Sequence, residues 1–76
     1  MEANKFLKDF VEIFDDKPSE TITMNTVFRD IEGWSSMAAL GLMAMVDLEY
    51  KIKISGQEIK DSKTVGDLYN IIINKH

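Results

Sequence analysis

The sequence predicts an all-α fold, a small four-helix bundle with a long loop between helices one and two and a short third helix. Apolar residues between positions 3 and 14 recur at spacings of three and four, which is typical of a helix. Positions 36–50 are rich in Ala, Leu and Met, which are strong helix formers. Motifs that commonly start helices follow at 55–58 and 64–67. A chain of 76 residues is expected to form one domain, spanning residues 1–76.

The first helix is predicted at residues 3–14. Its apolar residues would share one face, and they are Phe6, Leu7, Phe10, Val11, Ile13 and Phe14. The segment D-D-K-P-S at 15–19 should end this helix. Pro18 cannot continue a helix and disfavours helical geometry in the residue before it.

A long connection is predicted at residues 19–34. It is longer than most loops in compact domains, and such loops usually have a function or carry some structure of their own. We expect apolar side chains to anchor it to the core, with a short turn of helix near residues 25–29. The expected anchors are Ile22, Met24, Val27, Phe28, Ile31 and Trp34.

The second helix is predicted at residues 36–50. Ser35 is its expected N-cap, because a serine hydroxyl at this position accepts a hydrogen bond from a free amide of the first turn. Gly41 is expected to lower the stability of this helix by about 1 kcal/mol relative to alanine. The alternating segment K-I-K-I at 51–54 is short and has no partner strand, so we expect an extended connector there.

The second helix is apolar nearly all round, since residues 37–46 carry no charge. A domain this small cannot bury such a helix completely. One side is expected to line the core. The outer side is either further core packing or a surface offered to a partner, and it comprises Met37, Leu40, Ala44 and Leu48.

Capping motifs predict the starts of the last two helices. Ser55 and Glu58 are three residues apart and fit the capping box, so a short third helix should run through Ile59 and Lys60. Thr64 and Asp67 have the same spacing. A last helix should follow and run to the end of the chain, through Leu68, Tyr69, Ile71, Ile72 and Ile73.

Composition excludes several classes of function. Thirteen acidic residues outnumber nine basic ones, and the net charge of −4 opposes binding to nucleic acid. The uncharged run at 37–46 is about half as long as a membrane-spanning helix, which argues against membrane insertion. No apolar segment follows the first lysines as in a signal peptide. We therefore expect a soluble, cytoplasmic protein.

Few residues offer catalytic or metal-binding chemistry. The chain has no cysteine, and its single histidine, His76, is the last residue, where chain ends fray. The carboxylate pairs Asp15/Asp16 and Asp30/Glu32 are expected to be solvated rather than to bind a metal ion. The protein is therefore predicted not to be an enzyme.

Two adjacent serines precede the apolar helix. Ser35 would cap it, and on local pattern alone Ser36 is simply its first residue. No base lies nearby in the sequence to activate either hydroxyl. A role for Ser36 needs support from the wider pattern.

That wider pattern extends over nearly the whole chain. It consists of F-x-x-I-x-G-W-S-S-M at 28–37, L-E-Y at 48–50, I-x-I at 52–54 and T-V-G-D-L at 64–68. It resembles the acyl carrier protein family. In that family an Asp-Ser-Leu motif opens helix two, and its serine carries 4′-phosphopantetheine through a phosphodiester. The thiol of that arm holds acyl groups as thioesters, and many members have Thr-Val-Gly-Asp near the C-terminus.

The resemblance assigns roles to the two serines. Ser36 aligns with the modified serine and Met37 with the leucine, whereas Ser35 stands where the family has aspartate. Ser35 is the alternative attachment point, although a serine would then follow it instead of an apolar residue. A phosphate at a helix N-terminus is favourable on physical grounds, because it meets free amides and the positive end of the helix dipole.

The resemblance also implies a function. The protein would be a non-catalytic shuttle for acyl or aminoacyl groups in fatty-acid or specialised biosynthesis, and a monomer. Its partners would be a phosphopantetheinyl transferase and the enzymes that load and transfer acyl groups. The residues expected to contact these partners are Trp34, Met37, Leu40, Asp47 and Glu49.

The chain departs from the family along the second helix. Typical fatty-acid carriers have acidic residues there that meet basic patches on enzymes, but this chain has Ser35, Ala38 and Gly41 at those positions. A specialised carrier with a dedicated loading enzyme fits this change, and Trp34 resembles carriers of the aminoacyl, peptidyl or polyketide type. The alternative is an unmodified helical module that binds a protein through the apolar Met37–Met45 stripe.

Overall fold

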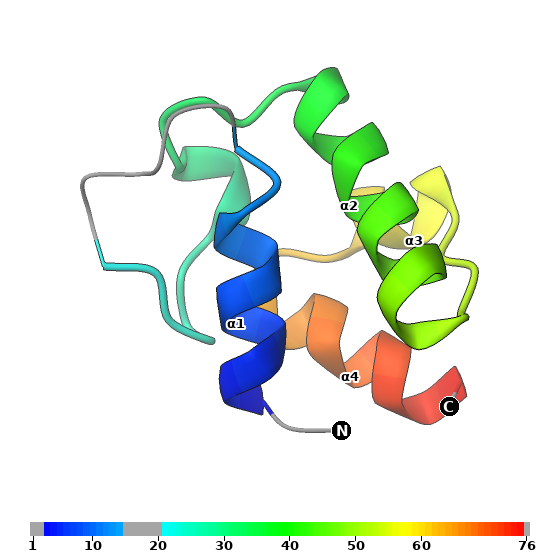
Figure 1. Ribbon diagram of the computed structural model, residues 1–76. Helices are drawn as coiled ribbons and strands as arrows, with labels where there is room; N and C mark the ends of the chain where they lie inside the picture. Colours follow the sequence, from blue (N-terminus) through cyan, green and yellow to red (C-terminus); the bar gives the residue numbers. More distant parts are fainter. Residues whose placement is uncertain (1–2, 15–20, 76) are drawn as a thin grey trace.

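The structure is a computed structural model that describes residues 3–14 and 21–75. These residues contain four α-helices and one short 3-10 helix. They are α1 (Ala3–Val11), η1 (Phe28–Asp30), α2 (Ser36–Tyr50), α3 (Gly56–Asp61) and α4 (Val65–Lys75). Helix α1 packs against α2 and α4, and α3 packs against α4 (Figure 1). The predicted all-α bundle, with its long first loop and short third helix, is confirmed. None of the described helices is both long and apolar enough to cross a membrane.

Helix α1 ends three residues before the predicted boundary at Phe14. After Val11 the backbone continues in tight turns, in which the amides of Ile13 and Phe14 donate to carbonyls three residues back, at 3.2 and 3.3 Å. The apolar period still holds at Phe14, whose ring is buried. Periodicity therefore predicted which residues face the core but not where the helix stops. Pro18, which was predicted to end this helix, lies outside the described residues.

The core forms between one face of each helix and the long loop. Helix α1 contributes Phe6 and Phe10, and their rings lie 6.2 Å apart. Helix α2 contributes residues spaced four apart, as expected for one face of a helix. The buried apolar side chains of the described residues are Phe6, Phe10, Phe14, Phe28, Ile31, Ala38, Leu42, Val46, Ile52, Ile54, Ile59, Val65, Leu68 and Ile72.

The connector at 51–54 forms neither a helix nor a strand, in line with the prediction of a connector, and Ile52 and Ile54 are buried in the core. Lys51, which ends α2, has a positive φ of 58° and donates its amide to the Asp47 carbonyl at 3.0 Å. A left-handed residue at this position is a common way to end a helix.

The long loop is anchored by its apolar side chains. Phe28 and Ile31 are buried, and Ile22, Met24 and Trp34 pack partly buried against the core. The helical turn predicted near 25–29 is found slightly later, at Phe28–Asp30. Threonine hydroxyls take part in the turn that precedes it, since Thr23 donates its amide to the Thr26 hydroxyl at 2.9 Å.

Backbone hydrogen bonds also tie this loop to the connection between α3 and α4. Val65 donates to the Thr26 carbonyl at 2.9 Å and Gly66 donates to the Met24 carbonyl at 2.8 Å. Val27 and Thr64 form an isolated antiparallel bridge. The predicted anchor Val27 therefore holds the loop through its backbone.

Arg29 clamps the loop to the end of α3. Its guanidinium donates to the carbonyls of Ser62 (2.6 Å), Lys60 (2.7 Å) and Ile59 (2.9 Å). The last carbonyls of a helix have no partner within the helix, so a cation that binds several of them stabilises its C-terminus. This arginine was not recognised in the sequence.

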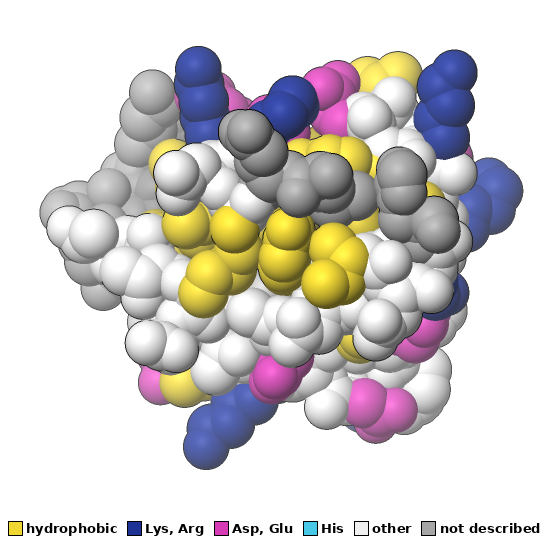
Figure 2. All heavy atoms as spheres, turned by 90° about the horizontal axis from the view of Figure 1, so that it is seen from below, with side chains coloured by type: hydrophobic (Ala, Val, Ile, Leu, Met, Phe, Trp, Pro, Cys, Tyr) yellow, Lys and Arg dark blue, Asp and Glu magenta, His cyan; other side chains and the backbone are white. Residues whose placement is uncertain are grey.

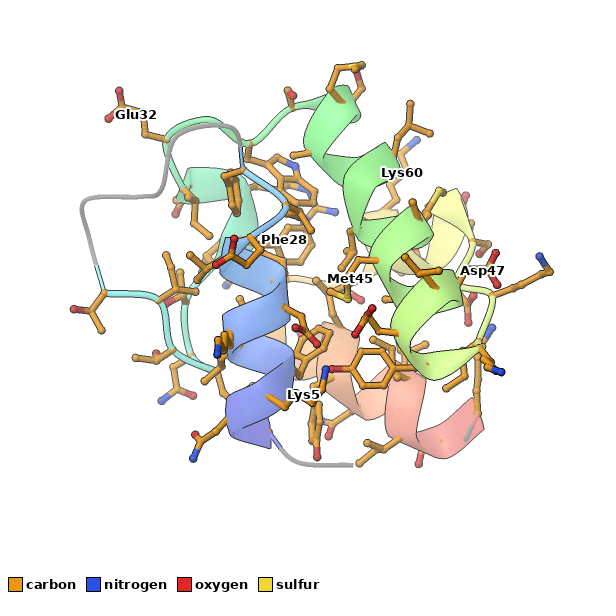
Figure 3. The ribbon with its side chains drawn as sticks, in the orientation of Figure 1. Lys5, Phe28, Glu32, Met45, Asp47 and Lys60 are labelled. Carbon is orange, nitrogen blue, oxygen red and sulfur yellow. The ribbon has the colours of Figure 1, made fainter. Side chains whose placement is uncertain are left out.

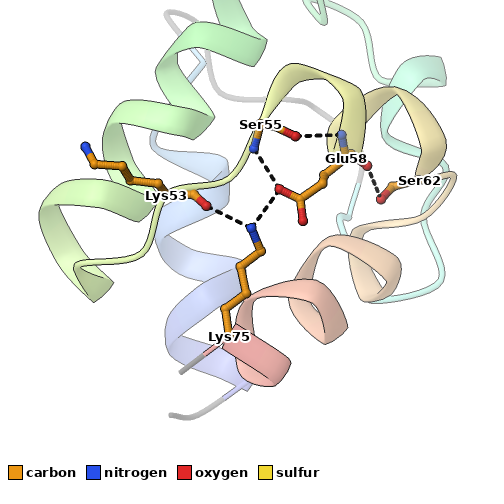
Figure 4. A network of polar contacts seen from close by, with 5 residues as sticks. All are labelled: Lys53, Ser55, Glu58, Ser62 and Lys75. Carbon is orange, nitrogen blue, oxygen red and sulfur yellow. Dashed lines mark hydrogen bonds and ion pairs between the residues drawn. The ribbon is translucent and has the colours of Figure 1, made fainter.

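The capping box of α3 is present as predicted. The Ser55 hydroxyl accepts from the Glu58 amide at 3.1 Å, and the Glu58 carboxylate accepts from the Ser55 amide at 2.9 Å. Lys75 at the end of α4 donates to the same carboxylate at 2.8 Å and to the Lys53 carbonyl at 3.0 Å (Figure 4). One polar network thus joins the start of α3 to the end of α4.

Gly66 occupies a position where a side chain would collide with the loop. A Cβ there would lie 2.9 Å from the Met24 carbonyl oxygen, because the two backbones approach closely to form their hydrogen bond. Gly66→Ala should therefore lower stability by about 1–3 kcal/mol, although glycine-to-alanine changes in helices usually raise it. The control is Gly56→Ala, where the new Cβ would meet only the end of the Met43 side chain at 3.6 Å. The melting temperatures of the two variants are compared by thermal unfolding. We expect Gly56→Ala to be neutral or stabilising, and a stable Gly66→Ala would contradict the close approach.

Asp67 completes the predicted cap of α4. Its carboxylate accepts from the amides of Thr64 and Lys63, each at 3.0 Å, and its own amide donates to the Thr64 hydroxyl at 3.1 Å. The hydrogen bond from the Thr64 amide, followed by that from Lys63, lowers the pKa of Asp67 below its ordinary value of 3.8. A lowered pKa stabilises the folded state above the unfolded value, and this stabilisation disappears as the pH falls through the folded value.

Asp67→Asn should therefore melt below the wild type at neutral pH, and the gap should close on acidification. The asparagine cannot titrate, so only the wild type loses a charged cap between about pH 4 and the lower folded pKa. Melting temperatures recorded along a pH series test this. If the difference in melting temperature stays constant to the lowest pH measured, the charge of Asp67 contributes nothing to stability.

Candidate functional site

The start of α2 presents two serines with different environments. Ser35 has an extended backbone, and its hydroxyl accepts from the Ala38 amide at 3.3 Å, so its predicted role as N-cap is confirmed. Its carbonyl accepts from Ala39 at 3.0 Å. Ser36 is the first helical residue and is exposed. Its hydroxyl bonds to none of the described residues, so it is available at the surface.

The chain enters α2 along a fixed path. Gly33 has a φ of +95°, which favours glycine, and the Trp34 amide donates to the Ile31 carbonyl at 3.0 Å. The indole of Trp34 meets the Phe28 ring edge-on at a centroid distance of 4.8 Å, and it lies 6.4 Å from the Phe10 ring. Trp34 thus packs between the loop and α1, and its contact with partners stays a prediction.

The electrostatics at the start of α2 favour an anion. A helix N-terminus carries a partial positive charge, and the first turn of α2 contains no acidic side chain to offset it. Ser35 uses the amides of Ala38 and Ala39, whereas the amides of Ser36 and Met37 have no acceptor within the helix. A phosphate on the Ser36 hydroxyl would therefore lie beside free amides.

A small open hollow of about 120 Å³ lies beside Ser35, between the residues that follow α1 and the start of α2. It is lined by Ile13, Phe14, Gly33, Ser35, Met37 and Ala38.

The two sides of α2 differ in burial. Ala38, Leu42 and Val46 face the core. Met45 lies between α1 and α2, as Figure 3 shows, and packs partly buried against the core together with Met43. These methionines belong to the core side of the helix.

The outer side of α2 is at the surface. Met37 is 75% exposed, Leu40 58% and Leu48 77%, and Ala44 between them is exposed as well. The alternative of further core packing is therefore excluded for these four residues, which we call the outer stripe. Apolar side chains also reach the surface on the underside of the bundle, and most charged side chains in that view lie toward its edges (Figure 2).

The acidic residues of α2 are paired within the chain. Asp47, which points outward in Figure 3, lies 3.6 Å from the Lys53 amine. Glu49 lies 3.4 Å from the Lys5 amine of α1. Their predicted contacts with partners stay predictions, but each already has a lysine beside it.

Lys5 is itself held in place. Its amine lies 2.7 Å from Asp9 and 5.4 Å from the centre of the Tyr50 ring. The Tyr50 hydroxyl donates to Asp9 at 2.9 Å. Burial, with this hydrogen bond, raises the pKa of Tyr50 to about 12, so the phenol stays protonated at neutral pH.

The described residues contain no cluster of three or more side chains that could hold a metal ion. Asp30 and Glu32 are exposed, and Glu32 points away from the bundle in Figure 3. The other predicted pair, Asp15/Asp16, lies outside the described residues.

Comparison with known proteins places this arrangement in a family. No protein-family model and no curated protein matches the chain. The solution NMR structure of the holo acyl carrier protein from Geobacter metallireducens does match, with a TM-score of 0.77. The two chains are 32% identical, and the match covers 96% of this chain and 83% of that one. Identity at this level, over this share of both chains, shows common family membership as well as a common fold. The chain belongs to the acyl carrier protein family.

Proposed function

We propose that this protein is a carrier whose Ser36 hydroxyl bears 4′-phosphopantetheine. The observation that supports this most is the exposed hydroxyl of Ser36 at the first turn of α2, in a chain of this family. When bound, the group supplies a thiol that holds acyl or aminoacyl cargo as a thioester.

The residues around Ser36 fit such a group. The amides of Ser36 and Met37 would be available to hold its phosphate, and an anion at a helix N-terminus contributes about 0.3–1 kcal/mol. Ser35 caps the helix, so it holds the first turn in shape without using the neighbouring hydroxyl. Packing of Trp34 against Phe28 keeps the preceding loop in place.

The protein as proposed is a shuttle without catalytic activity of its own. A phosphopantetheinyl transferase would modify Ser36, and other enzymes would load and transfer the cargo. The pathway is fatty-acid or specialised biosynthesis, and serine in place of the family's aspartate at Ser35 favours a specialised one. We propose that it acts in the cytoplasm as a monomer, without nucleic acid or membrane insertion.

A thiol assay tests the proposal without background, because the chain contains no cysteine. The protein is incubated with coenzyme A and a broad-specificity phosphopantetheinyl transferase, and small molecules are then removed. We expect one thiol per chain, and none when the transferase is omitted. If neither this transferase nor those of the cells that make the protein add a thiol, the proposal fails. The unmodified interaction module would then be the better description.

A further inference from the structure

A series of hydrogen bonds joins the long loop to the end of α3 and to the connection that follows it. The amides of Val65 and Gly66 donate to carbonyls of the loop, and the Phe28 amide donates to the Lys63 carbonyl at 3.3 Å. Arg29 extends this series onto α3 itself, because its guanidinium donates to carbonyls at the end of that helix. The loop and the end of α3 are therefore held to one another at several successive points.

Arg29 makes the most bonds in this series. Its guanidinium donates to the carbonyls of Ser62, Lys60 and Ile59 at 2.6, 2.7 and 2.9 Å. The planar guanidinium has five N–H donors in a fixed arrangement, so it can bind several acceptors at once. Although Arg29 is an exposed residue, its head group cannot leave this position without breaking three bonds. One side chain thus fixes the C-terminal end of α3 relative to the loop.

The same side chain lies against the aromatic residues that lead to Ser36. The guanidinium carbon of Arg29 is 4.8 Å from the centre of the Phe28 ring. Phe28 in turn meets the Trp34 ring edge-on at a centroid distance of 4.8 Å. Trp34 directly precedes Ser35, the N-cap of α2. These contacts follow one another without a break from the end of α3 to the residue before the cap.

We propose that Arg29 is a positioning residue for the modification of Ser36. By binding the end of α3 it holds Phe28 and Trp34 in place, and these two rings set the direction in which the first turn of α2 presents its hydroxyl. This inference rests on the proposed role of Ser36.

The chemistry of the modification makes it sensitive to position. The Ser36 oxygen forms a bond to the phosphorus that bears the pantetheine of coenzyme A, the bond from this phosphorus to adenosine 3′,5′-bisphosphate breaks, and the serine proton passes to a base of the transferase. The attacking and leaving oxygens must be roughly in line, and a misplacement of about 1 Å can cost about 100-fold in rate. Loss of Arg29 should therefore slow the transfer step more than it weakens the encounter with the transferase.

Transfer kinetics separate these two effects. The initial rate of thiol addition by the broad-specificity transferase gives kcat and KM for each chain. Arg29→Met keeps an apolar stem against Phe28 but has no donor, and we expect it to lower kcat about tenfold. Its KM should change less than about twofold. Arg29→Lys restores a charged donor without the planar fork, so its kcat should lie between those of Arg29→Met and the wild type.

Ser55→Ala is the matched control for a general loss of stability. It removes the N-cap at the opposite end of α3, where the Ser55 hydroxyl accepts from the Glu58 amide, and it leaves the bonds of Arg29 in place. Its kcat should equal that of the wild type. Circular dichroism establishes that all variants are folded at the temperature of the assay.

The fluorescence of Trp34 reports the packing without any transferase. Trp34 is the only tryptophan of the chain, so the signal has one source. Quenching by acrylamide measures how well the indole is shielded from solvent. We expect Arg29→Met to raise the quenching constant about twofold, because the loop opens more often once it is released from α3. Arg29→Lys should raise it less, and Ser55→Ala should match the wild type.

The proposal is overturned if kcat of Arg29→Met equals that of the wild type or falls no further than that of Ser55→Ala. It is equally overturned if kcat falls while the quenching of Trp34 stays the same. Failure of the proposed function looks different, since no chain then gains a thiol although Arg29→Met still changes the quenching.

Discussion

Ser36→Ala is expected to abolish attachment of the phosphopantetheine group and to leave the fold intact. The substitution removes the only atom of residue 36 that can form the phosphodiester. Ser36 is exposed and its hydroxyl contacts none of the described residues, so its loss should not disturb packing. Alanine is also the best helix former. The thiol content after treatment with coenzyme A and transferase should fall from one per chain to none, with a melting temperature at or above that of the wild type.

Ser35→Ala is the matched control and should show the opposite pattern. It removes the N-cap, which costs about 1 kcal/mol of stability, and it leaves the Ser36 hydroxyl in place. The variant should melt at a lower temperature and still gain one thiol. If Ser35→Ala gains none while Ser36→Ala is modified, the attachment point is Ser35 and the assignment made here is wrong.

Phe28→Ala should have the largest effect on stability. The Phe28 side chain is fully buried, meets the Trp34 ring edge-on at 4.8 Å and lies 4.8 Å from the Arg29 guanidinium. In Figure 3 it points from the loop into the bundle. Truncating a buried phenylalanine costs about 3–5 kcal/mol. A chain of 76 residues has roughly 4–11 kcal/mol in total, so this substitution should remove a large share of the free energy of unfolding.

Denaturant unfolding followed by circular dichroism measures this loss. Phe28→Leu is the control, because leucine keeps most of the buried volume, and we expect it to retain most of the stability. Phe28→Ala unfolding at the same denaturant concentration as the wild type would contradict the packing described for this loop.

The starts of the helices could be predicted because capping is local. Ser35, Ser55 and Thr64 each accept from an amide three residues further along the chain, and such pairs are visible in the sequence. The end of α1 could not be predicted in the same way. Its apolar pattern continues to Phe14, which is buried, although the backbone leaves the helix after Val11.

Contacts between distant segments had no signal in the sequence. Arg29 binds the carbonyl of Ser62, which is 33 residues further along the chain. Glu49 pairs with Lys5, which lies 44 residues before it. A match to Thr-Val-Gly-Asp indicated the family but not why a glycine is needed. The reason lies in the carbonyl of Met24, a residue of the long loop, because a Cβ at Gly66 would lie 2.9 Å from its oxygen.

At the site, sequence reasoning predicted the cap at Ser35, which is confirmed, and named the members of the outer stripe, whereas Ser36 as the attachment residue stays a prediction. It could not establish that the stripe is exposed, because an apolar helix gives no indication of which side meets the core. It also treated Asp47 and Glu49 as free to meet partners, since their pairing with Lys53 and Lys5 depends on the tertiary fold.

The most direct test of the proposed carrier function is the mass of the chain isolated from cells that make it. Intact-protein mass spectrometry is followed by fragmentation of a peptide that contains both Ser35 and Ser36. We expect a chain heavier by one phosphopantetheine group, with or without an acyl group on its thiol, and fragments that place the added mass on Ser36. A chain with only its unmodified mass, or one with the group on another residue, would contradict the assignment of Ser36 as the carrier residue.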